Sequence, residues 1–187
     1  MSDFSLIETR KLREVRKGEI RKHIINVIVK NEFGVLARIA TLIAGKGYNI
    51  ESLSVGETHE KGISRMTIEI IGDDIVIDQV VKQLRKLIDT IRVRDLTDIP
   101  HVERELVLIK VHTPTARARD EVLRITEIFR GKIVDVSQET YTIEVTGDED
   151  KIRAIVELLK PFGIKEMART GKIAMKREMD REESSQD

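Results

Sequence analysis

The sequence lacks several residue types on which many catalytic and binding sites depend. It contains no cysteine and no tryptophan, and aromatic residues make up only 3% of its 187 positions. The absence of cysteine excludes disulfides, thiolate nucleophiles and cysteine-ligated zinc. The shortage of aromatic side chains leaves little surface on which bases or sugars can stack. The 33 basic residues balance the 33 acidic ones, so no net charge attracts nucleic acid or an anionic membrane.

Long apolar runs are also missing. None approaches the roughly 18 residues that a membrane-spanning helix needs, and residues 1–22 lack the apolar stretch of a signal peptide. We therefore expect a cytoplasmic protein with no membrane and no nucleic-acid partner. Hydrophobic residues (40%) suffice for a packed core, and charged residues (35%) for a solvated surface.

The first half of the chain alternates between strand and helix periods. Ile25, Val27 and Val29 share one face of a strand, whereas Leu36, Ile39, Ala40 and Ile43 follow helical spacing. Gly72-Asp73-Asp74 predicts a turn and an N-cap for a second helix. The predicted strands are 23–29, 50–55, 63–71 and 91–96.

The second half repeats this order, and Gly147-Asp148-Glu149 again opens a helix. Each half reads βαββαβ, which predicts an α+β fold of two ferredoxin-like domains in tandem. We expect an extension at 1–22, a first domain at 23–98, a linker at 99–105, a second domain at 106–175 and a polar tail at 176–187. Ile24 and Ile28 make the helix-free face of the first sheet apolar, which predicts a dimer that pairs through sheets.

No pattern of catalytic residues emerges. The four histidines, His23, His59, His101 and His112, have no metal or triad spacing, so we interpret them as solvated or structurally satisfied. No two carboxylates lie in sequence surroundings so different that one would act as a general acid and the other as a general base. Arginines 117, 119, 124 and 130 can form a basic patch, but a solvated helix face balanced by acids is favoured.

One constellation has the features of a ligand site. Asn31 ends the first strand, Gly34 allows close approach to the backbone, and Val35 and Leu36 begin a helix whose free N–H groups suit a carboxylate. Such a site supplies the donors, acceptors and apolar wall that a zwitterionic amino acid needs. Taken alone, Asn-x-x-Gly also fits a common turn. The same holds for Gly47-Tyr48-Asn49-Ile50 as a helix-to-strand turn.

The order of these motifs resembles a known family. Segment 31–39 (Asn-Glu-Phe-Gly-Val-Leu-Ala-Arg-Ile) and segment 47–53 (Gly-Tyr-Asn-Ile-Glu-Ser-Leu) resemble an ACT domain. Together with segments 64–67, 101–106 and 119–131, they resemble the regulatory small subunit of acetohydroxyacid synthase, also called acetolactate synthase. The resemblance covers about residues 23–175, and the extension at 1–22 departs from it.

The resemblance implies a non-catalytic subunit with no cofactor of its own. A separate catalytic large subunit is expected to hold thiamine diphosphate, Mg and FAD, and the small subunit to raise its activity and confer inhibition by valine or another branched-chain amino acid. Two ACT domains are expected to pair side by side in a homodimer with valine between them. The valine ligands are then Asn31, Gly34, Val35 and Leu36 of one protomer and Asn49 and Ile50 of the other. Phe33 stands where family members differ, so no role is assigned to it.

Three other functions fit the same fold. An amino-acid-responsive regulator of transcription is the main alternative, but the N-terminal extension is too short for a helix-turn-helix domain. An RNA-binding ferredoxin-like domain needs aromatic side chains on its central strands, where only Tyr141 occurs. An acylphosphatase-type enzyme needs an arginine-bearing oxyanion loop, which is not evident.

Overall fold

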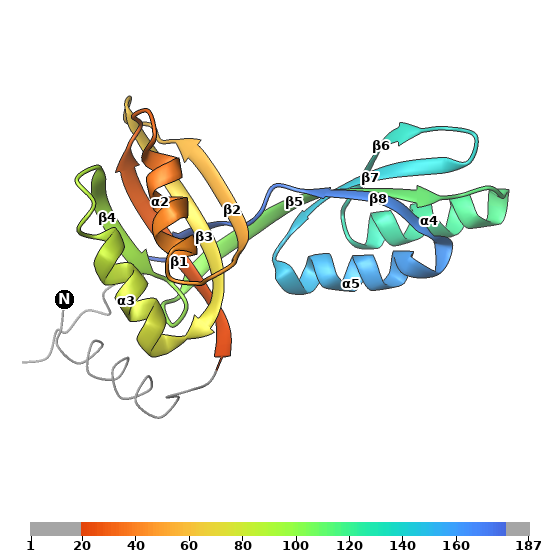
Figure 1. The fold of residues 1–187 in the computed structure, drawn as a ribbon. Coiled ribbons are helices and arrows are strands. Elements are labelled where there is room, and N and C mark those ends of the chain that lie inside the picture. Colours follow the sequence, from red (N-terminus) through yellow and green to blue (C-terminus); the bar gives the residue numbers. More distant parts are fainter. Residues whose placement is uncertain (1–19, 179–187) are drawn as a thin grey trace, which may run out of the picture. The chain divides into compact units, whose positions relative to one another are not determined.

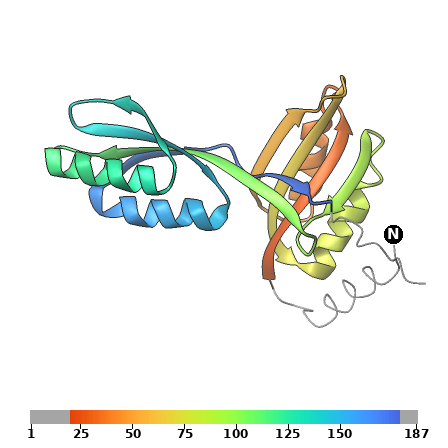
Figure 2. The same cartoon turned by 180° about the vertical axis from the view of Figure 1, so that it is seen from behind.

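The computed structural model describes residues 20–178 and divides them between two compact units. The first contains residues 20–51, 55–102 and 174–178, and the second contains residues 52–54 and 103–173. In each unit two helices cover one face of an antiparallel sheet, as the opposite views of Figures 1 and 2 show. Of the expected extension at 1–22, residues 20–22 begin the first strand and the rest lies outside the described residues.

The first unit has the predicted ferredoxin-like topology. Its strands are ordered β2-β3-β1-β4, and β1 is antiparallel to both of its neighbours. The elements are β1 (Ile20–Lys30), α2 (Val35–Ala44), β2 (Ile50–Glu57), β3 (Ile63–Asp73), α3 (Asp74–Leu84) and β4 (Thr90–Asp95). Because β2 is a terminal strand, one of its edges has no partner strand among residues 20–178.

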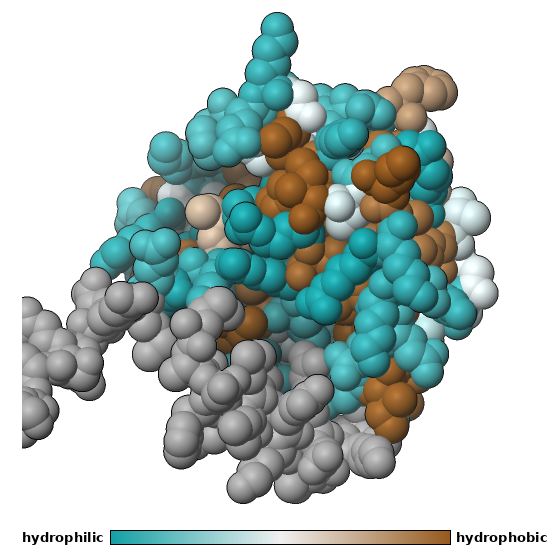
Figure 3. All heavy atoms as spheres, turned by 90° about the vertical axis from the view of Figure 1, so that its left-hand side faces the viewer, coloured by the Kyte–Doolittle hydropathy of each residue, from teal (hydrophilic) through white to brown (hydrophobic). Residues whose placement is uncertain are grey.

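The alternation of β1 creates the core of this unit. Ile25, Val27 and Val29 are fully buried because a strand turns alternate residues to the same face. The two helices bury residues at helical spacing, among them Ile39, Ile43, Ile77, Val80 and Leu84. Each such side chain contributes about 1.5–3 kcal/mol relative to an exposed position. Other apolar side chains of the unit reach the surface in separate places (Figure 3).

The helix-free face of the first sheet is covered at Ile24, whereas Ile28 is half-buried. Ile24 is only 9% exposed because it packs against Leu96 and Ala174. Ala174 belongs to a short strand, β9 (Ile173–Lys176), that the sequence did not predict. Side chains of the sheet hold this residue in place: Asn26 Nδ2 donates to the Ala174 oxygen (3.1 Å), and the Ala174 N–H donates to Thr67 Oγ1 (3.3 Å). An uncovered apolar face at Ile24 therefore gives no argument for a dimer.

The second unit repeats the topology with the strand order β6-β7-β5-β8, and β9 also pairs with β5. Residues 101–105 of the expected linker at 99–105 form the start of β5, because their alternation continues that of the strand. The elements are β5 (His101–His112), α4 (Ala116–Ile128), β6 (Lys132–Val136), β7 (Thr140–Gly147), α5 (Glu149–Leu159), a 3-10 turn (Lys160–Phe162) and β8 (Ile164–Arg169).

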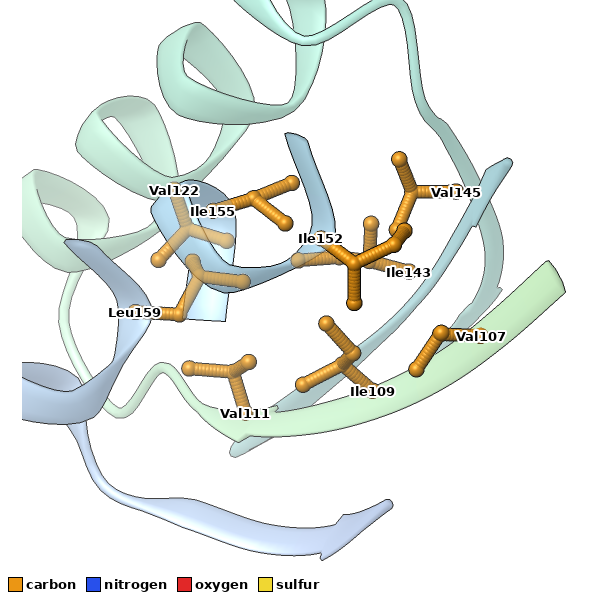
Figure 4. Packing of buried hydrophobic residues seen from close by; sticks show 9 residues of the cluster. All are labelled: Val107, Ile109, Val111, Val122, Ile143, Val145, Ile152, Ile155 and Leu159. Atoms are coloured by element: carbon orange, nitrogen blue, oxygen red, sulfur yellow. The ribbon is translucent and has the colours of Figure 1, made fainter. Parts of the chain in front are cut away.

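The core of the second unit lies between its sheet and its helices. Figure 4 shows β5 and β7 directing their alternate residues toward α4 and α5. The buried set is Val107, Ile109, Val111, Val122, Ile143, Val145, Ile152, Ile155 and Leu159. On the opposite face Lys110 Nζ donates to Glu166 Oε2 at 2.9 Å, which raises the pKa of Lys110 and lowers the pKa of Glu166. Within residues 20–178 no helix combines the length and apolar character needed to span a membrane.

Candidate functional site

The start of α2 differs from the starts of the other three α-helices within residues 20–178. Asp73, Thr115 and Asp148 cap α3, α4 and α5, each through a side-chain oxygen that accepts a backbone N–H. Asp73 and Asp148 confirm the helix starts predicted from the sequence, although at Gly72-Asp73-Asp74 strand β3 runs directly into α3 without the predicted turn. At the start of α2 stands Gly34, and no side chain of the described residues caps this helix. The Val35 N–H donates to the Glu32 oxygen at 3.4 Å, whereas the next N–H groups of the first turn face a helix start without a side-chain cap and with the positive end of the helix dipole behind it.

The backbone of Gly34 explains why glycine stands at this position. Its φ is 83° and its ψ −4°, a left-handed conformation that glycine adopts without strain. A methyl group added at Gly34 would contact no atom within 4 Å outside its chain neighbours, so the space before the helix is open. The Gly34 oxygen already accepts the N–H of Arg38 at 3.0 Å, which fixes the first turn of α2. The arrangement can hold an anion.

The predicted site residues of this loop surround that space in different ways. Asn31 is exposed directly after β1, and its backbone N–H donates to the Gly62 oxygen at 2.8 Å. Val35 is only 4% exposed, so it can offer a ligand its backbone but little of its side chain. Leu36 is 44% exposed, and Phe33 is fully exposed beside it. Polar and apolar groups thus meet at the start of α2.

The other two predicted residues, Asn49 and Ile50, lie at the opposite end of the sheet. Ile50 begins β2, whereas the far end of β2, at Glu57, adjoins Gly62 and hence Asn31. Eight residues of strand span roughly 25 Å, so one chain cannot bring Asn49 to Asn31. Asn49 is exposed, and its Nδ2 donates to Glu51 Oε1 at 3.1 Å.

A charged pair next to the α2 start escaped the sequence reasoning. Arg38, one helical turn after Gly34, places Nη2 2.5 Å from Asp89 Oδ2. Asp89 is 6% exposed, and its backbone oxygen accepts the N–H of Lys30 at 2.9 Å. The pair ties α2 to the turn before β4 and fixes the loop at Asn31 from the side. Only the helical spacing from Gly34 to Arg38 could have pointed to this cation.

No group of three or more His, Asp or Glu side chains within residues 20–178 is placed to hold a metal ion. His23 is fully buried, with Nε2 3.3 Å from Asp74 Oδ1 and Nδ1 3.6 Å from Asp95 Oδ2. Next to it, Arg21 contacts Asp74 at 2.9 Å and Asp98 at 2.7 Å. The hydrogen bonds to Asp98, and then those to Asp74, raise the pKa of Arg21 and keep it cationic. This cluster joins β1, α3 and the segment after β4.

Known proteins share the sequence and fold of this chain. A family profile described as the small subunit of acetolactate synthase matches residues 104–178, and one described as an AHAS small subunit-like ACT domain matches residues 25–92. The chain is 80% identical over 178 residues to the acetolactate synthase small subunit of Aquifex aeolicus. This match covers 95% of the present chain and 92% of the Aquifex protein. The chain is also 43% identical over 157 residues to the acetolactate synthase small subunit of Mycobacterium bovis, with coverage of 84% and 93%. The crystal structure of the acetolactate synthase small subunit from Thermotoga maritima superposes with a TM-score of 0.76 at 42% identity, covering 86% of this chain and 99% of that chain.

Proposed function

We propose that this chain raises the activity of a catalytic large subunit and makes that activity sensitive to valine. The proposal starts from its family: the chain belongs to the acetolactate synthase small subunits and is a regulatory, not a catalytic, subunit. The proposal assigns no cofactor to this chain and leaves thiamine diphosphate, Mg and FAD to the catalytic subunit. The observation that carries it is the uncapped start of α2. A free amino acid carries the carboxylate that such a helix start lacks.

The side chains near this start favour a small branched amino acid. Leu36 and Phe33 offer exposed apolar surface, and Asn31 offers both a donor and an acceptor for the polar end of the ligand. Arg38, one turn into the helix, pairs through Nη2 with Asp89. Leucine and isoleucine share these features, so valine is the first ligand to test.

A homodimer completes the proposed site. When a two-fold axis pairs two copies of a terminal strand, the two strands run antiparallel. Pairing through β2 would then bring Ile50 of one copy to the Glu57 end of β2 in the other, which is the end that carries Asn31. Asn49 and Ile50 of one protomer would thus face Asn31, Gly34 and Leu36 of its partner. A ligand bound between two copies can bias their arrangement, as feedback requires.

Gly34→Asp tests the carboxylate site. We expect this change to abolish valine binding in isothermal titration calorimetry, because the new carboxylate occupies and repels the position of the ligand's own. In mixtures with the catalytic subunit, acetolactate formation should then continue in the presence of valine. Gly34→Asn is the matched control, since asparagine also tolerates a left-handed backbone and has a similar shape without the charge. Asn31→Ala should weaken binding about tenfold or more through the lost hydrogen bonds.

Unchanged valine affinity in Gly34→Asp would contradict the site. A wild-type chain that neither raises acetolactate formation nor confers valine inhibition would contradict the proposed function itself. Circular dichroism of each variant separates loss of binding from loss of fold.

A further inference from the structure

A shallow hollow lies between the end of α4 and the start of α5 in the second unit. Ile128, Phe129, Arg130 and Lys151 line it. Ile128 is the last residue of α4 and is 75% exposed, whereas Phe129 packs against the core beneath. The hollow therefore combines an exposed aliphatic side chain with two cations.

The positive charge of the hollow is not neutralised locally. The guanidinium of Arg130 has no carboxylate partner within residues 20–178. Lys151 is held at the rim, because its Nζ donates to the Thr146 oxygen at 2.8 Å. The two aspartates nearest in sequence to Lys151 are engaged: Asp148 caps α5, and Asp150 pairs with Arg153 at 2.6 Å. An apolar surface flanked by two such cations complements an acidic and apolar partner.

The backbone at Arg130 is unusual. Its φ of 52° makes it the one non-glycine residue with a positive φ in the described part of the chain. Glycine normally occupies this position after a helix. The structure thus keeps a large cationic side chain where the backbone favours glycine, and strained residues of this kind gather at functional positions. Arg119 differs, since its guanidinium donates to the backbone oxygens of Thr113 and Gln138 and serves the fold.

We infer that this hollow docks an acidic segment of the catalytic large subunit, in which a carboxylate lies next to an apolar side chain. The carboxylate contacts Arg130 and Lys151, and the apolar side chain packs on Ile128. The inference rests on the catalytic partner that family membership implies and is independent of the valine site.

Arg130→Gly gives a sharp test because glycine suits the observed backbone, so the variant removes the cation without straining the fold. With the full chain and the catalytic subunit, we expect binding to weaken about tenfold in biolayer interferometry, with a matching loss of activation. Ile128→Ser should weaken binding as well. Arg117→Ala, an exposed arginine of the same helix, is the control and should bind like the wild type. Added salt should weaken wild-type binding more than that of Arg130→Gly.

Each outcome decides the inference. Binding of Arg130→Gly and Ile128→Ser within about twofold of the wild type would overturn it. A change in the oligomeric state of Arg130→Gly with normal binding of the catalytic subunit would assign the hollow to self-association and also overturn it. Failure of the wild type to bind the catalytic subunit would overturn both this inference and the proposed function. Valine calorimetry on the isolated chain should be unaffected by Arg130→Gly, which keeps the two proposals distinguishable.

Discussion

At the scale of single residues, a cluster of buried charges lies at the start of β1. Arg21 is 17% exposed and holds Asp74 and Asp98 with four hydrogen bonds of 2.7–3.3 Å. Asp74 is only 4% exposed, and Arg21 supplies two of these hydrogen bonds to its carboxylate. A buried carboxylate that loses its cation is strongly destabilising.

Arg21→Met should therefore lower the free energy of unfolding by about 3 kcal/mol, measured by urea denaturation. Arg153→Met is the matched control, because Arg153 and Asp150 form a pair that is 68% and 84% exposed. Exposed pairs contribute less than about 1 kcal/mol. Equal losses in the two variants would show that burial does not decide the strength of the Arg21 contacts.

Local chemistry made some residues predictable and others not. The caps at Asp73 and Asp148, and the glycine at position 34, act on backbone within three residues of themselves, so short motifs revealed them. The contact of Arg21 with Asp98 spans 77 residues. In a chain with 35% charged residues, no local pattern selects that pair from the other possible ones.

At the scale of elements, strand β9 is an example of an element that the periodicity of apolar residues did not predict. The strand has only four residues, which is too short for a reliable alternation, and it lies where a domain end and a polar tail were predicted. Its partners Asn26 and Thr67 are 148 and 107 residues away in the sequence. The longer strands of both units, by contrast, follow from their alternating apolar residues.

Thr67→Val should loosen β9 while keeping the shape of the side chain. The Ala174 N–H would lose its acceptor in a buried position, which costs about 1–3 kcal/mol. Hydrogen exchange should accelerate at Ala174 more than at the core amides of β1. Thr67→Ser keeps the hydroxyl and should exchange like the wild type. Equal exchange rates in Thr67→Val would mean that this hydrogen bond does not hold the strand.

At the scale of the whole molecule, the repeated βαββαβ order was predictable because each core face has its own period, 2 for strands and 3.6 for helices. The partner of the first sheet was predicted incorrectly at Ile24, because an apolar sheet face looks the same whether β9 or another chain covers it. For the candidate site, the residues named from the family resemblance stay a prediction. The resemblance assigned Asn31 and Asn49 to different protomers, and the direction of β2 gives the physical reason, because it places the two residues at opposite ends of the sheet.

Because Asn31 and Asn49 lie far apart in one chain, we predict that variants at these two positions complement each other in a mixed dimer. Asn31→Ala and Asn49→Ala should each abolish high-affinity valine binding, because each damages one side of both sites in a homodimer. Subunits mixed, unfolded together and refolded should recover part of the binding capacity, since a mixed dimer contains one intact site. A refolded Asn31→Ala preparation alone is the control and should recover none. If the mixture also fails to recover binding, Asn31 and Asn49 do not build one site across two protomers.

The uncapped start of α2 has a consequence for the proposed response to a bound amino acid. If a bound amino acid supplies the missing cap, it acts as a removable part of the helix and stabilises the first turn further while it is bound. The stabilisation then grows with the logarithm of the ligand concentration above its dissociation constant. Under the proposed function, the concentration of the bound amino acid would set the stability of the first turn of α2.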